Sequence, residues 1–210
     1  MSKQSYDTLV HPPEIGAPLI FACHGTGGDA AQFFSFARQV DRRAGVVAPN
    51  GDVEVDGASR FFKRRGADIY DMQDLPGRVD KMVAFVAAHK ADHPTSPVYA
   101  MGYSNGANIL SSVFLRRPDL FDRLALMHPL VPWTPAPHDE LGGRQVLITA
   151  GRQDAICSWE HSERLITWLS EQGVLVETLI HSGGHDIAVE EYRAVRAFLT
   201  RPAALKGDMP

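Results

Sequence analysis

Short apolar runs alternate with amphipathic helical patterns along most of this chain, and this alternation constrains the fold more than any other feature. Most of the runs are almost continuously apolar, as strands are when helices cover both faces of a parallel sheet. We predict strands at 19–23, 45–48, 98–101, 123–127, 146–150 and 174–180. Apolar residues at helical spacing predict helices that contain residues 79–86, 107–114, 165–169 and 192–198. This order favours a three-layer, doubly wound α/β fold with a mostly parallel sheet.

The length of the chain suits one such unit. At 210 residues it can bury one large core but is short for two. We therefore expect a single domain over residues 1–200 and a frayed C-terminal tail over residues 201–210. Two segments interrupt the alternation, residues 51–74 and residues 129–143. Irregular connections of this length are often functional.

One boundary between a strand and a helix carries a chemical signal. The sequence Gly102-Tyr-Ser104-Asn-Gly106 lies between them. When a strand turns into a helix within a few residues, the residue at the apex is strained and its side chain is exposed. The positions two before and two after must then lack bulk. A flexible Gly/Ser turn could contain the same residues, but their place between a strand and a helix indicates that Ser104 is a nucleophile.

Two further polar residues follow predicted strands. In open α/β sheets, the residues that do chemistry gather at the carboxyl ends of the strands. Asp154 follows the fifth predicted strand, and His185 lies in a glycine-rich loop after the sixth. Taken alone, Asp154 fits a turn or a helix cap equally well, but the order Ser104, Asp154, His185 is one in which catalytic triads occur. His128 also lies near a strand end but precedes Asp154, and His181 is expected to pack at a strand edge.

A second glycine-rich segment, residues 24–29, follows the first predicted strand. Acyl transfer places negative charge on the former carbonyl oxygen, and glycines let backbone N–H groups converge on that point. We expect the donors to be the N–H groups of Thr26 and Asn105. The other residues assigned to this supporting loop are His24, Gly25 and Gly27. A phosphate-binding loop is the alternative, but neither Gly-Lys-Ser/Thr nor Gly-x-Gly-x-x-Gly occurs.

The two irregular segments carry the residues expected to determine specificity. The candidates for an apolar substrate pocket are Phe61, Phe62, Tyr70 and Trp133. These aromatic residues fit the ordinary packing of long loops onto a sheet equally well. A basic run beside them consists of Arg60, Lys63, Arg64 and Arg65. Most such runs are solvated surface, and an anionic substrate or product is the open alternative.

Composition argues against several other classes of protein. A formal net charge of −4 gives no support for a nucleic-acid partner. No apolar run approaches the length of about 20 residues that spans a bilayer, so we expect no stable membrane insertion. The N-terminus lacks the apolar core of a secretion signal, and Cys23 and Cys157 are too few for a disulfide framework, so a cytoplasmic location is expected. Metal-ligand spacings are absent as well, so no metal site is expected, and Cys157 is predicted to be a small buried thiol.

With these residues together, the chain resembles a small esterase of the α/β-hydrolase superfamily. It most resembles the bacterial phospholipase/carboxylesterase branch, which includes acyl-protein thioesterase-like and dienelactone hydrolase-like proteins. The resemblance extends from about Leu19 to about Leu199 and depends on the motifs at residues 24–29, 102–106, 151–154 and 183–185. It implies hydrolysis of carboxylic esters or thioesters without a cofactor and without a large cap domain, and it allows a homodimer.

Two departures from the branch narrow this expectation. Thioesterase members typically carry Gln after the nucleophile, where this chain has Asn105, and dienelactone hydrolases use Cys where it has Ser104. We therefore expect a serine hydrolase that cleaves small-molecule esters of small or medium acyl groups through an acyl-enzyme. The alternatives are a thioesterase or lysophospholipase that takes longer acyl chains, a peptidase, and a non-catalytic small-molecule-binding protein on a hydrolase scaffold.

Overall fold

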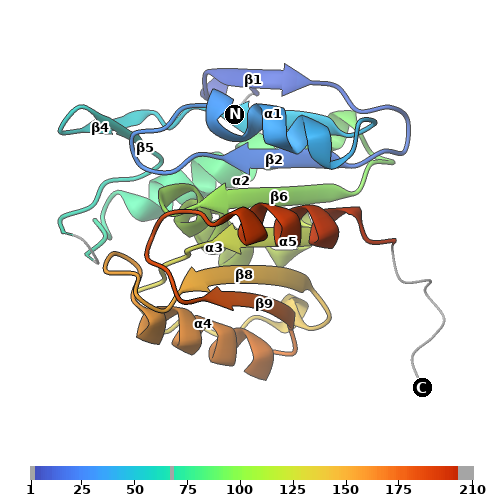
Figure 1. Ribbon diagram of the computed structural model, residues 1–210. Coiled ribbons are helices and arrows are strands. Elements are labelled where there is room, and N and C mark those ends of the chain that lie inside the picture. The colour runs from blue at the N-terminus through green and yellow to red at the C-terminus, as the bar shows by residue number, and fades with distance from the viewer. Residues whose placement is uncertain (1–2, 67–68, 203–210) are drawn as a thin grey trace.

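The computed structural model describes residues 3–66 and 69–202, and a large sheet forms its centre (Figure 1). The strands of this sheet are β1 (Thr8–His11), β2 (Leu19–Cys23), β3 (Gly45–Pro49), β6 (Val98–Tyr103), β7 (Arg123–Met127), β8 (Gln145–Gly151) and β9 (Leu175–His181). Their order across the sheet is β1-β3-β2-β6-β7-β8-β9. All neighbours pair in parallel except β1, which runs antiparallel to β3. A separate hairpin joins β4 (Val53–Val55) to β5 (Ala58–Arg60).

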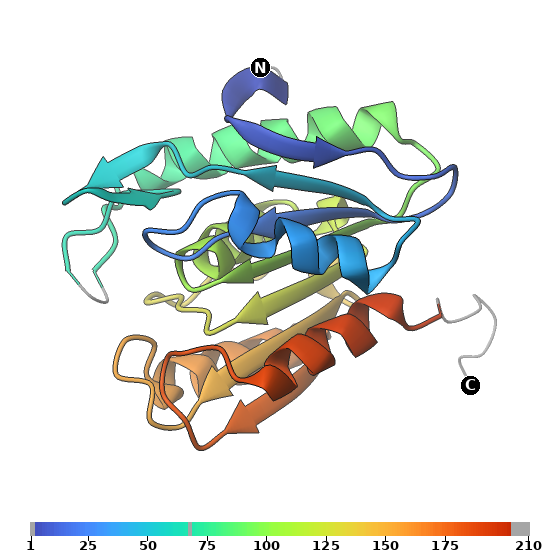
Figure 2. The ribbon, with the colours of Figure 1, turned by 45° about the horizontal axis from the view of Figure 1, so that its top comes forward.

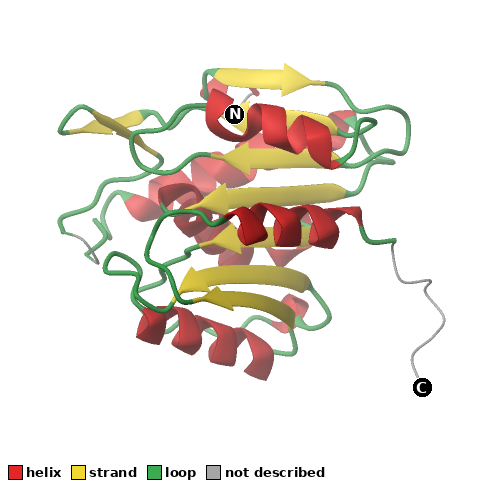
Figure 3. Ribbon diagram, viewed as in Figure 1, coloured by secondary structure: helices red, strands yellow, loops and turns green. Residues whose placement is uncertain are grey.

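Helices cover both faces of the large sheet. They are α1 (Ala31–Val40), α2 (Leu75–Asp92), α3 (Asn105–Arg116), α4 (Trp159–Glu171) and α5 (Val189–Thr200), with short 3₁₀ helices at Lys3–Ser5, Pro118–Leu120 and Asp139–Leu141. Helices α1 and α5 lie on one face, and α2, α3 and α4 lie on the other (Figure 3). The predicted three-layer, doubly wound sheet is confirmed.

Each face of the sheet has its own hydrophobic core. Strands β2, β3 and β7 are buried at every residue, which explains why their sequences are almost continuously apolar. Phe21, Phe85 and Phe114 belong to the core under α2, α3 and α4, whereas Phe33 and Phe198 belong to the core under α1 and α5. Successive side chains of a strand point to opposite faces, so β2, β3, β6, β7 and β8 each contribute to both cores.

Three elements were not predicted. Strand β1 lies at the edge of the sheet, where Leu9 and Val10 are 43% and 53% exposed, so its sequence shows neither alternation nor a continuous apolar run. Helix α1 buries Phe33, Ala37 and Val40, which stand at helical spacing that the sequence prediction overlooked. The hairpin β4–β5 is short and lies in a segment predicted to be irregular.

The predicted C-terminal tail is held at its start. The Arg201 guanidinium donates to Glu177 with Nη2 at 2.8 Å from Oε2, and Arg123 Nη2 donates to the carbonyl oxygen of Pro202 at 3.2 Å. These contacts differ from the expectation of fraying from residue 201. The remainder of that tail, residues 203–210, lies outside the described residues.

The carboxyl ends of the parallel strands point to one edge of the sheet, on the left in Figure 1 and Figure 2. The hairpin β4–β5 and the loops that follow β6, β7, β8 and β9 gather at this edge. The elements of residues 3–66 and 69–202 include no inserted cap domain. None of the helices described in those ranges combines the length and apolar character needed to cross a bilayer.

Candidate active site

The turn between β6 and α3 presents Ser104 on strained backbone. Ser104 has φ 49° and ψ −113°, a conformation outside the regions open to most side chains, and such strain costs on the order of 1–3 kcal/mol. A Cβ at Gly102 would lie 2.6 Å from the carbonyl carbon of Gly106, and a Cβ at Gly106 would lie 2.3 Å from the backbone oxygen of Cys23. Strand, helix and the neighbouring loop therefore touch here, which is the reason that the sequence requires glycine at both positions.

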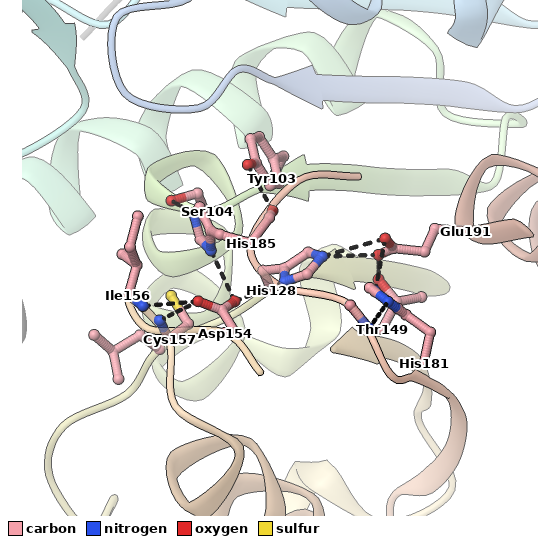
Figure 4. Close-up of polar contacts among 12 residues, drawn as sticks. Tyr103, Ser104, His128, Thr149, Asp154, Ile156, Cys157, His181, His185 and Glu191 are labelled. Carbon is pink, nitrogen blue, oxygen red and sulfur yellow. Dashed lines mark hydrogen bonds and ion pairs between the residues drawn. The ribbon is translucent and has the colours of Figure 1, made fainter. Parts of the chain in front are cut away.

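The side chains of Ser104, His185 and Asp154 form a chain of hydrogen bonds (Figure 4). His185 Nε2 lies 3.0 Å from Ser104 Oγ, and His185 Nδ1 lies 2.8 Å from Asp154 Oδ2. The Asp154 side chain is fully buried, whereas that of His185 is 16% exposed. The structure thus brings together the three residues predicted at the ends of β6, β8 and β9. In this geometry Ser104 can pass its proton to an imidazole that a carboxylate orients.

Asp154 is buried but keeps its charge. Its Oδ1 accepts hydrogen bonds from the backbone N–H groups of Ile156 and Cys157, each at 2.8 Å. Its Oδ2 lies 2.8 Å from the Nδ1 atoms of both His185 and His128. Burial alone would raise the pKa of this carboxyl, but the hydrogen bonds, led by the one to His128, hold it well below its usual range. Burial also raises the pKa of the Cys157 thiol to about 12, as expected for an inert buried cysteine.

A second histidine, His128, lies on the other side of Asp154 and was not predicted as part of the site. Its side chain is fully buried, and its Nε2 lies 3.2 Å from Glu191 Oε1. Thr149 Oγ1 donates to Glu191 Oε2 at 2.5 Å, and His181 Nε2 lies 3.1 Å from Glu191 Oε1. A buried polar network therefore extends from Asp154 to the first turn of α5 (Figure 4).

His128 is a cation within this network. Both ring nitrogens face carboxylate oxygens, so both carry a proton. Burial lowers the pKa of His128, but the hydrogen bonds to Asp154 and Glu191 outweigh burial and raise it to about 9. The pKa of Glu191 is held below its usual value, despite burial, by its hydrogen bonds to His128 and Thr149. The place of His128 just after β7 was the available signal in the sequence, because residues at strand ends meet at this edge.

In the loop after β2, the N–H of Thr26 has no acceptor among the described residues. The N–H groups of its glycines are bonded internally: Gly25 to Gln32 Oε1, Gly27 to Ser59 O and Gly28 to Gly25 O. Within the described ranges, no acceptor takes the N–H of Thr26 or the N–H of Asn105, the first residue of α3. These are the two donors predicted to bind a developing negative charge.

Hydrogen bonds tie the irregular segment after β3 to the loops beside Ser104. Gly51 N–H donates to His24 Nε2 at 2.8 Å, so His24 carries its proton on Nδ1, which lies 2.6 Å from Gly25 O. Burial lowers the pKa of His24 and favours this neutral form. Phe61 N–H donates to Asn105 Oδ1 at 2.7 Å. His24 was predicted to support this loop, and contacts at both of its ring nitrogens set the orientation of the ring.

A cavity of about 550 Å³ opens beside Ser104 and His185. The four predicted aromatic pocket residues do not line it, which corrects that prediction. Phe61, Phe62 and Tyr70 are buried in the hydrophobic core. Trp133 packs against the same core and lines a different cavity, of about 470 Å³, beside α4. The alternative interpretation, packing of long loops onto the sheet, describes these aromatic residues, because an irregular segment gives no period from which the direction of a side chain can be inferred.

Two overlapping sets of side chains are close enough to ligate a metal ion. In the described part of the chain they are His128 with His181 and Glu191, and His128 with Asp154 and His185, with ligand atoms within 4.8 Å of one another. Hydrogen bonds and short ion-pair contacts already join these groups. A metal ion at either set would have to displace the protons between them.

Comparisons with known proteins bear on the fold and the family of this chain. No protein-family model matches the chain. The Bacillus subtilis protein MhqD, whose assignment as a hydrolase is provisional, is 33% identical over 180 residues, which cover 85% of this chain and 90% of MhqD. The structure of Atu2452, a protein of unknown function from Agrobacterium tumefaciens, has a TM-score of 0.88 and 44% identity over 95% of this chain and 98% of its own. A carboxylesterase from Bacillus cereus has a TM-score of 0.84 and 29% identity, covering 92% and 93%.

Proposed function

The chain belongs to the α/β-hydrolase superfamily, and we propose that it is a serine hydrolase that cleaves carboxylic esters of small or medium acyl groups. The observation that carries this proposal is the continuous hydrogen-bonded path from Ser104 through His185 to Asp154. The similarity to a carboxylesterase supports an ester as the bond that is cleaved.

The proposed reaction has two steps. Ser104 Oγ attacks the ester carbonyl carbon while His185 Nε2 takes the hydroxyl proton, and Asp154 stabilises the imidazolium that forms. The carbon–oxygen bond to the alcohol then breaks, and the alcohol leaves with the proton from His185. Water attacks the acyl-enzyme, gives a proton to His185, and releases the carboxylic acid as the Ser104 oxygen takes that proton back. Each step moves one proton from the attacking oxygen to Nε2 and from there to the leaving oxygen.

The unused N–H groups of Thr26 and Asn105 are proposed to bind the negative oxygen of the tetrahedral intermediates. Backbone donors that have no internal acceptor can bind this oxygen without first breaking a bond. Removing one such donor typically costs about 100- to 1000-fold in rate. The hydrogen bonds from Gly25, Gly27 and Gly28 hold the loop in shape and support this role.

The cavity argues against long acyl chains as the main substrates. Its lining includes few apolar side chains, namely Val55, Tyr103 and Ile156, and several charged ones. A long acyl chain needs a predominantly apolar pocket. We therefore place a thioesterase or lysophospholipase activity on long chains second, together with a binding protein that has no catalytic function.

A fluorophosphonate probe and a panel of p-nitrophenyl esters test the proposal. We expect the wild-type protein to be labelled and to hydrolyse acetate and butyrate esters faster than the decanoate ester. Ser104→Ala should lose labelling and at least about a thousandfold in kcat/KM. Ser111→Ala is the matched control, because Ser111 lies in α3, the helix that follows Ser104, and its Oγ donates to the Ala107 carbonyl.

The outcomes separate the rival functions. A folded wild-type protein that the probe does not label would support the non-catalytic binding protein. A maximum at decanoate would support the long-chain enzymes. Equal hydrolysis by the wild-type protein and Ser104→Ala would reject Ser104 as the nucleophile.

A further inference from the structure

Three arginines line the cavity beside Ser104, and all come from the basic run in the irregular segment after β3. These arginines are Arg60, Arg64 and Arg65, and Asp56 is the one acidic residue in the lining. The lining therefore contains three guanidinium groups and one carboxylate. Lys63 belongs to the same basic run but does not line the cavity. An excess of positive charge in a cleft attracts anionic molecules.

Arg65 differs from the other two arginines because it has an internal counter-ion. Its Nε lies 3.2 Å from Asp71 Oδ2. Over residues 3–66 and 69–202, neither Arg60 nor Arg64 has a carboxylate oxygen within 4.0 Å. Two of the three positive charges in the cavity are thus not paired within this part of the protein.

Arg60 and Arg64 are held in place by uncharged acceptors. Arg60 Nη1 donates to Thr26 Oγ1 at 3.0 Å, and Arg64 Nε donates to Gly66 O at 3.2 Å. Arg60 Nε and Arg64 Nη2 are buried and have no hydrogen-bond partner in the described residues. Leaving a buried donor unsatisfied costs free energy, and a ligand that accepts hydrogen bonds removes that cost.

The two guanidinium groups also repel each other. Burial and the charge of Arg64 lower the pKa of Arg60, and the carboxylate of Asp56 opposes this only in part. Arg64 is fixed over the ring of Tyr70, with Cζ 5.9 Å from the ring centroid. Tyr70 in turn is buried and donates its hydroxyl to the Leu130 carbonyl. An anion near both groups would relieve the repulsion.

Building on the esterase function proposed above, we propose that Arg60 and Arg64 bind a carboxylate of the substrate, so that the preferred substrates are esters that carry a free carboxylate. The planar guanidinium group matches carboxylate geometry and holds its charge at every physiological pH. A half-ester of a short dicarboxylic acid offers a reacting carbonyl and a carboxylate within one small molecule. A cavity of about 550 Å³ has room for both groups.

Monomethyl succinate and dimethyl succinate form the matched substrate pair. Hydrolysis of the first breaks the acyl carbon–oxygen bond, consumes one water and gives methanol and succinate. We would measure kcat/KM for both esters with the wild-type protein, Arg60→Gln, Arg64→Gln and Lys63→Gln. Lys63→Gln removes the same charge from the same run outside the cavity and is the control.

We expect the wild-type protein to prefer the monoanion by at least about tenfold, since a hydrogen bond to a charged group is worth that much or more. Arg60→Gln and Arg64→Gln should each reduce the preference by about tenfold or more, whereas Lys63→Gln should retain it. The same preference in all four proteins would overturn the inference, and so would its absence in the wild-type protein.

A binding measurement separates this inference from the esterase proposal. Calorimetric titration of monomethyl succinate into Ser104→Ala should give saturable binding, and the additional change Arg64→Gln should weaken it about tenfold or more. If no protein hydrolyses either ester but this binding difference remains, the esterase proposal fails and the anion site stands. If the wild-type protein hydrolyses both esters and the binding difference is absent, the anion site fails alone.

Discussion

Raising the pH from 6.5 to 8.5 is expected to remove about 2 kcal/mol of folding stability through His128 alone. The pKa of His128 is raised from 6.5 to about 9 by its contacts with Asp154 and Glu191. A histidine with a raised pKa contributes its full stabilisation below pH 6.5, where the unfolded chain is also protonated. That stabilisation amounts to about 3 kcal/mol in full. It is lost as the pH rises through the pKa that His128 has in the folded protein.

The comparison protein is the double variant His128→Gln/Glu191→Gln. This variant removes the positive charge of His128 and one of its two carboxylate partners. Glutamine at position 128 can still bond to Asp154. Glutamine at position 191 can still accept the hydrogen bond that the Ala188 N–H donates to Glu191. Urea unfolding at several pH values between 6.5 and 8.5 would give the free energy of unfolding of both proteins. We expect the difference between them to shrink by about 2 kcal/mol as the pH rises.

Titrating groups outside this network do not produce this difference. The pKa values of His24 and His89 are lowered by burial, so both groups change stability in the opposite direction and equally in the two proteins. Burial raises the pKa values of Cys23 and Cys157, so these thiols lower stability only near the top of this range, and equally in the two proteins. Parallel curves for the two proteins, or an NMR titration of His128 with a midpoint near 6.5, would refute the reasoning.

Two further predictions concern close contacts around Ser104. Gly106→Ala would place a Cβ 2.3 Å from the backbone oxygen of Cys23. We therefore expect the free energy of unfolding, measured in urea, to fall by about 3 kcal/mol. Gly77→Ala is the control, because the new Cβ in α2 would have no neighbouring atom within 4 Å and should leave this free energy unchanged. Tyr103→Phe removes the 2.8 Å hydrogen bond to the His185 carbonyl. If this bond positions the imidazole, kcat for ester hydrolysis should fall about fivefold. An unchanged kcat would show that it does not.

Steric requirements and strand order made much of the site predictable. The spacing of Gly102 and Gly106 reflects a contact between backbones, which any sequence that makes this turn must respect. Ser104, Asp154 and His185 each stand at the carboxyl end of a strand, and parallel strands bring those ends to one edge. Proximity thus follows from the order of the elements, without knowledge of packing.

The network behind Asp154 could not be derived in the same way. His128 was set aside because the triad order needs the histidine last, yet a carboxylate oxygen has two lone pairs, and Asp154 Oδ2 holds both imidazoles. Glu191 stands in the first turn of α5, where a solvent-exposed acid is common. Its burial depends on how α5 packs against β7 and β8, and its side chain also caps the helix at Ala188.

The segment of residues 51–74 combines roles that are usually dispersed. Arg60, Arg64 and Arg65 of this segment line the cavity. Phe61, Phe62 and Tyr70 of the same segment are buried in the hydrophobic core. The nucleophile, the imidazole and the carboxylate all come from other parts of the polypeptide. The residues proposed to determine selectivity and those proposed to cleave the bond therefore lie in separate stretches of the sequence. Replacement of residues 51–74 during evolution could then change the substrate preference while the reaction chemistry stays the same.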